Sequence, residues 1–498
     1  MILLLAFVLT QEGGIPVAVD DRLVIELVAR DPDLATPTGI AVDPGGRIWV
    51  VENNTHMRPK EYKGRPTDRI LIFDDFGPDG RARKITTFAE GFRHGMGLAW
   101  RGPGEVILVT RNDIARLRDL DGDGRADDRL TLVRLDTTGT YDHNGLFGPA
   151  FDGLGDLYFG LGGNTSGEFP FGAPYTLVGS DGSTHSEDEG GRIFKCRSDG
   201  SKVAFVAKGF WNPFHLAFDG LGRLFAVDND PDERPPCRLL HVVPGGDFGF
   251  RRRNGGRGLH PFTSWDGEIP GTLPMVAGTG EAPSGIVAHE DTLLVTAWGD
   301  HEIQRFRLAA RGASFSSRAE TVIRGGESFR PVGIVVAPDG SVCISDWVDR
   351  SYPVHGKGAL WRIRPRKSIE RRPAGLEGPG ARLQALWAGR VTVDHALRDG
   401  AEEVRGEAAR LLPAEDPRRL SLAASDSSAF VRLQALLGVR VDSREVERLL
   451  PFLAGSDPFL SSAATSALAR TGDGPSLARH LSSKDFQVRL GVLLALRL

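Results

Sequence analysis

The sequence lacks the cysteine patterns that would cross-link a small fold or hold a metal ion or a haem. Its 498 residues include three cysteines, Cys196, Cys237 and Cys343, which are far apart. This spacing excludes a disulfide framework and a C-x-x-C metal or redox motif. A C-x-x-C-H run is also missing, so covalently attached c-type haem is not encoded.

The chain also lacks an excess of positive charge and, beyond its start, any long apolar run. A formal net charge of -4 provides no general attraction for nucleic acid, which we therefore exclude as a partner. The apolar run Ile2–Leu9 is too short to span a bilayer, and no other segment could form a transmembrane helix. Its length suits the core of a signal peptide, although a basic flank and a small-residue cleavage site are missing. We expect residues 1–19 to be a leader and the protein to be periplasmic or secreted, with a buried first strand as the alternative.

One phrase recurs six times along the first 350 residues and predicts the fold. Each copy has a small residue, an apolar triplet, a turn with Gly, Pro or Asp, and a second apolar run. The copies start at Gly39, Gly97, Gly148, His215, Gly285 and Gly333, at intervals of 58, 51, 67, 70 and 48 residues. These intervals match four-stranded blades, so we predict an all-β six-bladed propeller over residues 20–365. Residues 23–29 and the strand from Gly358 are expected to pair and close the ring, which removes exposed sheet edges.

The last part of the chain has a helical period instead. Residues 366–381 are rich in Pro and Gly and read as a linker. From residue 382 to 498, segments starting at Asp399, Asp426, Asp457 and Asp485 recur every 27, 31 and 28 residues. Each pairs an Asp at the expected helix N-cap with apolar residues at helical spacing. This all-α region resembles HEAT repeats, whose stacked helices offer a surface to a protein partner.

Propeller geometry predicts where polar residues converge. The innermost strand of a blade and the strand after it run in opposite directions, so residues before the first and after the second share one face. At such positions lie Arg111, Asn112, His143, Asn212 and Arg330. We expect them to ring one mouth of the central channel, the alternative being that loop ends are polar in any protein.

A second candidate site is the loop DLDGDGRADD. It provides carboxylates at Asp119, Asp121, Asp123 and Asp127, with Gly124 for a sharp turn. Alternating carboxylates suit Ca²⁺, which takes six to eight oxygen ligands. Leu130 stands where an EF-hand has its last Glu, so this is not an EF-hand. The prediction is a calcium site, with a solvated acidic hairpin as the alternative.

Three segments carry a resemblance to a known family: HNGLFGPAFDGLGDLYFGLGG from His143, GFWNPFHLAFDGLGRLFAVDND from Gly209, and RLLHVVPGGDFGFR from Arg238. They are similar to the soluble glucose and sorbosone dehydrogenases, six-bladed propellers that bind pyrroloquinoline quinone (PQQ) and Ca²⁺. The stretch PTGIAVDPGGRIWVVENN, with THMRPKEYKGRPTDRILIF, looks more like the membrane-bound dehydrogenase propellers of planctomycetes. Those proteins often carry HEAT repeats and a cytochrome c.

The resemblance implies roles for individual residues. His143 matches the family's catalytic base, which removes a sugar hydroxyl proton, and Asn212 matches an amide that contacts PQQ. Trp211 and Phe214 stand where the family has an arginine and a glutamine, and only Arg330 represents a pair of cofactor-binding arginines. The predicted cofactor-binding residues are thus Asn212, Trp211, Arg330, Arg111 and Asn112. A tricarboxylate such as PQQ loses charge-assisted hydrogen bonds with each missing cation.

Two classes of function fit the sequence. The first is a PQQ- and calcium-dependent oxidoreductase of a sugar or alcohol, with an electron-accepting cytochrome as a possible partner. The second is a non-catalytic propeller that binds a glycan or protein and uses the helical repeats as a partner platform. Aromatic replacements such as Trp211 and Phe214 favour stacking on sugar faces and hence the second class. No G-x-G-x-x-G motif opens a helix after a strand, so a Rossmann-bound nicotinamide is not expected.

Overall fold

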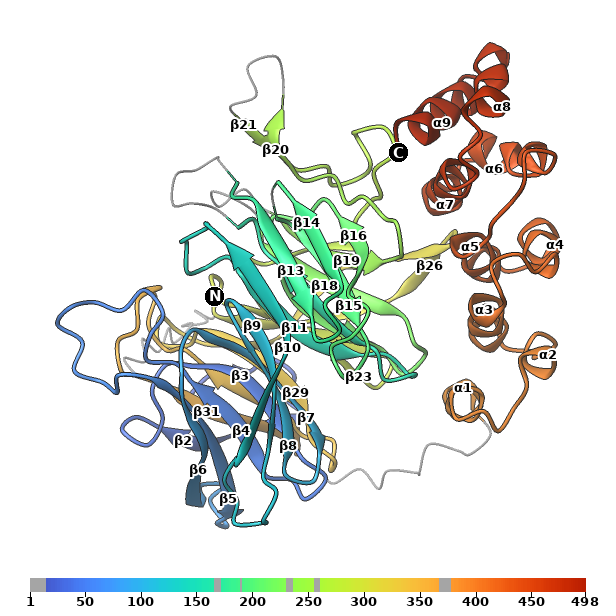
Figure 1. The fold of residues 1–498 in the computed structure, drawn as a ribbon. Coiled ribbons are helices and arrows are strands. Elements are labelled where there is room, and N and C mark those ends of the chain that lie inside the picture. The colour runs from blue at the N-terminus through green and yellow to red at the C-terminus, as the bar shows by residue number, and fades with distance from the viewer. Residues whose placement is uncertain (1–14, 165–171, 189, 230–235, 255–259, 367–377) are drawn as a thin grey trace, which may run out of the picture.

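The computed structural model describes residues 15–164, 172–188, 190–229, 236–254, 260–366 and 378–498. It confirms a six-bladed β-propeller followed by a smaller helical region, seen side by side in Figure 1. Blade one contains β3 (Pro37–Val42), β4 (Ile48–Glu52), β5 (Asp68–Phe76) and β6 (Ala82–Phe92). Blade two contains β7 (Gly95–Gly102), β8 (Glu105–Thr110), β9 (Asp113–Arg118), β10 (Asp128–Thr137), β13 (Tyr175–Gly179) and β14 (Thr184–Glu187). Blade three contains β11 (Leu146–Phe151), β12 (Leu157–Leu161), β15 (Arg192–Cys196) and β16 (Ala204–Lys208).

The other three blades follow the same plan. Blade four contains β17 (Asn212–Phe218), β18 (Leu224–Asn229), β19 (Cys237–Val242) and β22 (Ala277–Thr279). Blade five contains β23 (Pro283–His289), β24 (Thr292–Ala297), β25 (Glu302–Arg307), β28 (Ala319–Arg324) and β1 (Val17–Ala18). Blade six contains β29 (Pro331–Val336), β30 (Val342–Asp346), β31 (Ala359–Pro365) and β2 (Leu23–Arg30). Two hairpins lie outside the blades: β20 (Arg251–Asn254) with β21 (His260–Phe262), and β26 (Ala309–Arg311) with β27 (Ser314–Ser316).

The ring closes where the sequence predicts. Strand β2 pairs antiparallel with β31, from Leu23 opposite Pro365 to Arg30 opposite Ala359. Strand β1 adds to the edge of blade five by pairing with β28. The propeller therefore already includes Val17 and Ala18, which fall within the predicted leader 1–19, while residues 1–14 lie outside the described part of the chain.

The glycine that opens most repeats is explained by close contact between neighbouring blades. A Cβ built on Gly97 in β7 would lie 1.7 Å from the carbonyl oxygen of Gly148 in β11, and one on Gly39 in β3 would lie 2.7 Å from the backbone of Gly97. Any side chain would push these innermost strands apart. One repeat begins with His215 in place of glycine. Its Nδ1 accepts a hydrogen bond from the main-chain N–H of Ile286 in the next blade at 3.2 Å, so this side chain bonds to the neighbouring blade.

The helical region forms a stacked array. Its α-helices are α1 (Pro379–Trp387), α2 (Val393–Ala396), α3 (Glu402–Leu411), α4 (Arg418–Ser425), α5 (Ala429–Leu437), α6 (Leu450–Ala454), α7 (Pro458–Ala469), α8 (Gly474–Ala478) and α9 (Phe486–Arg497). Helices α3, α5, α7 and α9 contact one another in sequence, while each shorter helix packs on its neighbour. In the described part of the chain no helix is long and apolar enough to cross a membrane.

Only two of the four predicted aspartate N-caps are caps. Asp457 and Asp485 accept hydrogen bonds from the first main-chain N–H groups of α7 and α9. The cap of α3 is Ala401 and that of α5 is Ser428, each two residues further on. There Asp399 pairs with Arg382 of α1 and Asp426 pairs with Arg405 of α3, so the aspartates tie successive repeats together.

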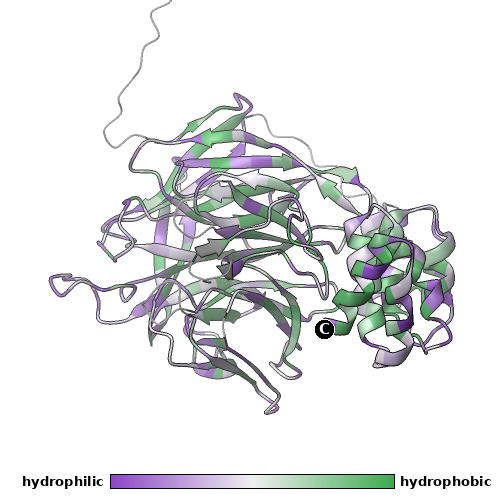
Figure 2. Cartoon of the chain, turned by 90° about the horizontal axis from the view of Figure 1, so that it is seen from above, coloured by the Kyte–Doolittle hydropathy of each residue, from purple (hydrophilic) through white to green (hydrophobic). Residues whose placement is uncertain are grey.

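The helices pack on the side of the propeller through a shared apolar core. Figure 2 shows the array from above, lying against one flank of the blades. One buried cluster joins Val243 and Phe248 of blade four with Leu453 and Phe459 of the helices. The ring of Phe459 also stacks on His241 at 5.7 Å. Because such burial is favourable in proportion to the apolar area removed from water, the two regions form one continuous body.

Candidate functional site

A pocket opens at one end of the central channel, where the innermost strands begin. Its empty volume is about 570 Å³, a figure that includes the open solvent at its mouth. It is lined by Thr38, His56, Met96, His143, Phe214, Asn229, Ala282, Pro283, Ser284, Trp298, Val332, Trp347 and Tyr352. The lining is mostly aromatic and apolar, and it includes no lysine, arginine, aspartate or glutamate among the described residues.

Aromatic rings form the wall around His143. Tyr352 packs against the His143 imidazole with ring centroids 4.7 Å apart, and Trp298 stacks on Tyr352 at 5.3 Å. Phe214 lies 6.2 Å from His143 on the other side and stacks on Phe147 beneath it. Tryptophan and tyrosine faces of this kind pack well against the C–H faces of a sugar ring.

Two uncharged imidazoles lie in this pocket, which Thr38, Asn229 and Ser284 also line. His56 and His143 have ring centroids 5.6 Å apart, and the Nδ1 atom of each is buried without a hydrogen-bond partner among the described residues. Burial lowers the pKa of His143 to about 4. Burial, and then the neighbouring His143, His94 and Arg111, hold the pKa of His56 well below its ordinary value. At neutral pH both rings are therefore uncharged, and each keeps one ring nitrogen that can accept a hydrogen bond.

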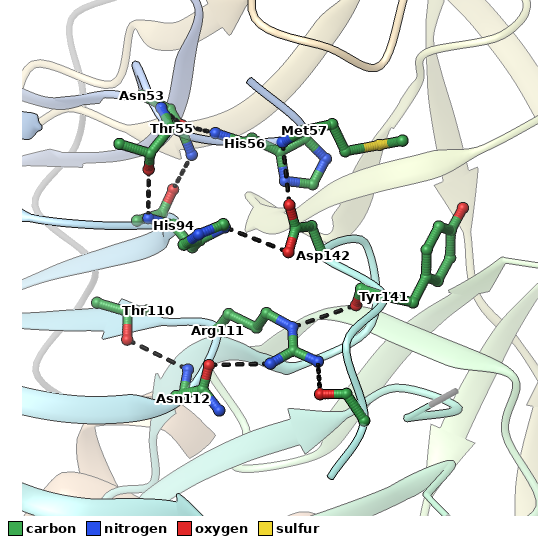
Figure 3. A network of polar contacts seen from close by, with 12 residues as sticks. Asn53, Thr55, His56, Met57, His94, Thr110, Arg111, Asn112, Tyr141 and Asp142 are labelled. Atoms are coloured by element: carbon green, nitrogen blue, oxygen red, sulfur yellow. Dashed lines mark hydrogen bonds and ion pairs between the residues drawn. The ribbon is translucent and has the colours of Figure 1, made fainter. Parts of the chain in front are cut away.

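A polar network fixes the loop that carries His143 (Figure 3). Arg111 donates from Nε to the carbonyl of Tyr141 at 3.2 Å and from Nη2 to the carbonyl of Gly139 at 2.7 Å. Asp142 accepts a hydrogen bond from the main-chain N–H of Met57 at 3.2 Å, and its other oxygen lies 3.7 Å from Nδ1 of His94. The loops that carry His56 and His143 are thus joined through Asp142.

The arginines and the asparagine predicted to bind a cofactor hold protein groups instead. Besides its bonds to the His143 loop, Arg111 donates to the side chain of Asn112 at 2.9 Å, so Asn112 supports Arg111. Arg330 is buried beneath Trp298, with its guanidinium carbon 5.1 Å from that ring. It donates to the carbonyls of Trp298 and Gly299 and pairs with Glu327 at 2.9 Å.

Trp211 and Asn212 lie beneath the pocket and outside its lining. Trp211 packs between Phe250 and the guanidinium of Arg252. Asn212 is fully buried and donates weakly to the main-chain carbonyl of His143 at 3.5 Å. The structure therefore places Asn212 as a support of the His143 loop.

Two carboxylates at the ends of second strands, Asp228 and Asp346, are buried structural groups. Asp228, at the end of β18, accepts hydrogen bonds from the main-chain N–H groups of Trp211 and Asn212 and pairs with Arg238. Asp346, at the end of β30, accepts a hydrogen bond from the main-chain N–H of Arg330. Burial raises the pKa of Asp346 to about 6. Each carboxylate thus satisfies main-chain N–H groups at the turn that enters an innermost strand.

Sequence reasoning missed His56 and Tyr352. Both lie several residues beyond the end of a second strand, on the loops after β4 and β30 that fold back over the mouth. The blade pattern locates only the residues next to the strands. The sequence signal that could have found His56 is the unusually long polar connection between β4 and β5, which runs from residue 53 to 67.

The aspartate loop is a separate site on the β9–β10 turn. One oxygen each from Asp119, Asp121 and Asp127 can lie within 4.8 Å of one another, and this is the only such group of three or more among the described residues. Asp123 falls outside the group, although it was expected to be a ligand. Its side chain accepts a hydrogen bond from the main-chain N–H of Arg125 at 2.8 Å and shapes the turn.

Calcium is expected to raise the melting temperature of the protein through this loop. A ligand that binds only the native state stabilises it by mass action. Asp121→Asn and Asp127→Asn should abolish the shift, whereas Asp123→Asn, the matched control, should keep it. The measurement is thermal unfolding with millimolar Ca²⁺ or with a chelator. Equal melting temperatures in the two wild-type samples would make the loop an acidic turn only.

The chain is similar to one family model and to several solved structures. The family model "Domain of unknown function (DUF7133)" matches residues 15–243, and no curated protein matches the chain. An oxidoreductase (glucose dehydrogenase) from Thermus thermophilus has 19% identity and a TM-score of 0.50 over 69% of this chain and 100% of that one. The calcium structure of a Trichoderma reesei family AA12 carbohydrate-active enzyme has 15% identity and a TM-score of 0.51 over 70% and 97%. A PQQ-bound aldose sugar dehydrogenase from Streptomyces coelicolor has 17% identity and a TM-score of 0.49 over 70% and 100%.

At these identities the Thermus and Trichoderma structures show a shared propeller fold only. Whether a cofactor fits has to be judged from the residues of the pocket. PQQ carries three carboxylates, which need cationic donors. The described lining of the pocket contains no cation, and the guanidinium groups of Arg111 and Arg330 are directed at protein acceptors. The residues present therefore do not fit a tricarboxylate in this pocket.

Proposed function

We propose that the protein is an oxidoreductase of a neutral sugar or alcohol that binds in the aromatic pocket. The observation that carries this proposal is the uncharged imidazole of His143, which lines the pocket and whose Nδ1 has no hydrogen-bond partner among the described residues. A general base must be unprotonated and must lie within hydrogen-bond reach of the hydroxyl it deprotonates. The fold shared with a chain named glucose dehydrogenase supports the same class of reaction.

The charge distribution around the pocket favours a neutral ligand. The described lining offers no acidic side chain to a cation, and the guanidinium of Arg330 already lies against the ring of Trp298. An anion would find no free guanidinium in that lining. Neutral hydroxyl groups, in contrast, match imidazoles that both donate and accept, and the aromatic wall matches the C–H face of a sugar ring.

In the proposed reaction, His143 accepts the proton of the hydroxyl group while the carbon that bears this group loses a hydride. The hydride passes to a two-electron acceptor of the quinone or redox-dye class, which is the co-substrate of the proposal. The protein contributes substrate binding, exclusion of water by the aromatic wall, and a base held in place by Arg111 and Asp142. We also propose calcium at the aspartate loop, export of the chain, and contact of the helical array with an electron-accepting protein.

A second candidate function is non-catalytic binding of a glycan. The observation that favours it is the commitment of Arg111 and Arg330 to main-chain carbonyls, because a dehydrogenase that uses PQQ needs cations for its carboxylates. The same pocket and the same neutral ligand serve both candidates. They differ in whether electrons leave the bound sugar.

The test is sugar-dependent reduction of a redox dye by the purified protein, with and without added PQQ and Ca²⁺, alongside calorimetric binding of the same sugars. The proposal expects saturable binding of at least one neutral aldose or alditol and dye reduction that depends on it. Binding without reduction under any condition favours the second candidate. No binding and no reduction would contradict both.

A further inference from the structure

We infer that His56 and His143 together bind two adjacent hydroxyl groups, so the pocket selects ligands with a vicinal diol. This inference rests on the proposed function and names its substrate class. Both imidazoles line the pocket, their centroids are 5.6 Å apart, and their planes are tilted by 55°. His56 is 4% exposed, and neither Nδ1 atom has a hydrogen-bond partner among the described residues.

The spacing suits two hydroxyl groups better than one. Hydroxyl groups on neighbouring carbons lie on the order of 3 Å apart, and an O–H to nitrogen hydrogen bond has a similar length. Two rings 5.6 Å apart can therefore each bind one oxygen of the same diol. A ligand with a single hydroxyl would leave one buried imidazole without a partner, which weakens binding by roughly 10- to 100-fold.

The two imidazoles are held in this relation by main-chain and side-chain hydrogen bonds. Asp142 precedes His143 in the chain and accepts a hydrogen bond from Met57, which follows His56 (Figure 3). The main-chain N–H of His56 is in turn bound by the side chain of Asn53 at 2.9 Å. The loops of the two histidines are therefore tied together by hydrogen bonds.

The surroundings of the pair point to an organic diol and not to a metal ion. The His56 ring packs edge-on to Trp347, and the His143 ring packs on Tyr352, so aromatic faces flank both. A metal ion would need further ligands, and no third His, Cys, Asp or Glu completes such a group with this pair among the described residues. The ring carbons of a cyclic diol would contact the aromatic faces while its oxygens bind the imidazoles.

The experiment compares cis-1,2-cyclohexanediol with cyclohexanol, two ring compounds that differ by one hydroxyl group. Binding is followed by the fluorescence of the pocket tryptophans in the full chain. Wild-type protein is expected to bind the diol at least about 10-fold more tightly. His56→Phe keeps a ring but removes both nitrogens, so it should reduce this preference to below about threefold.

Two further variants make the result interpretable. His289→Phe changes a histidine at the opposite end of β23 from the pocket and should keep the full preference. His56→Gln retains hydrogen-bonding groups and should keep part of it. A wild type that binds and oxidises sugars without preferring the diol, or a folded His56→Phe variant with the full preference, would overturn the inference alone. If no sugar or probe binds the wild type, the inference and the proposed function both fail.

Discussion

Replacing His143 by glutamine or phenylalanine is expected to lower kcat for sugar oxidation by roughly 100- to 10,000-fold, the usual contribution of a positioned base. The imidazole lines the pocket, its Nδ1 has no hydrogen-bond partner among the described residues, and burial lowers its pKa to about 4. KM should change much less, because the aromatic wall that binds the sugar remains. The measurement is dye-linked turnover under saturating sugar.

The pH profile gives this prediction an independent readout. A base must be unprotonated, so wild-type turnover should stay flat from about pH 8 to about pH 5 and fall as the pH drops through about 4. His289→Gln is the matched control, since that histidine contacts the carbonyl of Gly340 far from the pocket. Variants of His143 that keep wild-type turnover, with the same acid limb, would show that another group is the base.

Replacing Arg238 by methionine is expected to destabilise the protein by about 3–5 kcal/mol, the usual cost of breaking a buried ion pair. Arg238 and Asp228 are 2% and 1% exposed, with Nη2 and Oδ2 2.5 Å apart. Arg238 also donates to the carbonyls of Gly209 and Ser264 at 3.0 Å. The variant would leave the Asp228 carboxylate buried without its cation, and chemical denaturation measures the loss.

Two comparisons test the cause of this loss. Arg134→Met breaks an exposed pair with Asp136 and should leave the stability almost unchanged, because exposed ion pairs contribute little. Burial already raises the pKa of Asp228 above its ordinary value, and loss of Arg238 should raise it further. The folded variant then gains protons as the pH falls, so its deficit against wild type should shrink towards about pH 4. A deficit equal to that of Arg134→Met would contradict the structural role of the pair.

The fold was predictable because the packing of each blade against the next requires the same residue pattern in every repeat. Each innermost strand opens with a small residue such as Gly39 or Gly97, since the neighbouring blade leaves no room for a side chain. Turn residues then mark the hairpin. The pairing of β2 with β31 was also predictable, because a closed ring requires a strand from the start of the propeller to pair with one from its end. The caps at Asp457 and Asp485 also follow from local sequence, whereas Asp399 and Asp426 pair with arginines that only the tertiary packing brings near.

The candidate site was predictable only in part. Strand position placed His143 at the mouth, but it could not tell a guanidinium that faces the pocket from one that supports it. Arg111 and Arg330 turn towards main-chain carbonyls because buried loop carbonyls need donors, and the sequence does not show which carbonyls those are. His56 and Tyr352 were missed because long loops return over the mouth along paths that strand periodicity does not encode.

The central claim, that the mouth pocket binds a neutral sugar, is tested most directly by calorimetric titration of the wild-type protein with a neutral aldose, the corresponding uronic acid and the corresponding amino sugar. The account predicts saturable one-to-one binding of the neutral sugar and weaker binding of both charged analogues, because the described lining has neither a cation nor a carboxylate. Tightest binding of the uronic acid or of the amino sugar, or no binding of the neutral one, would contradict it.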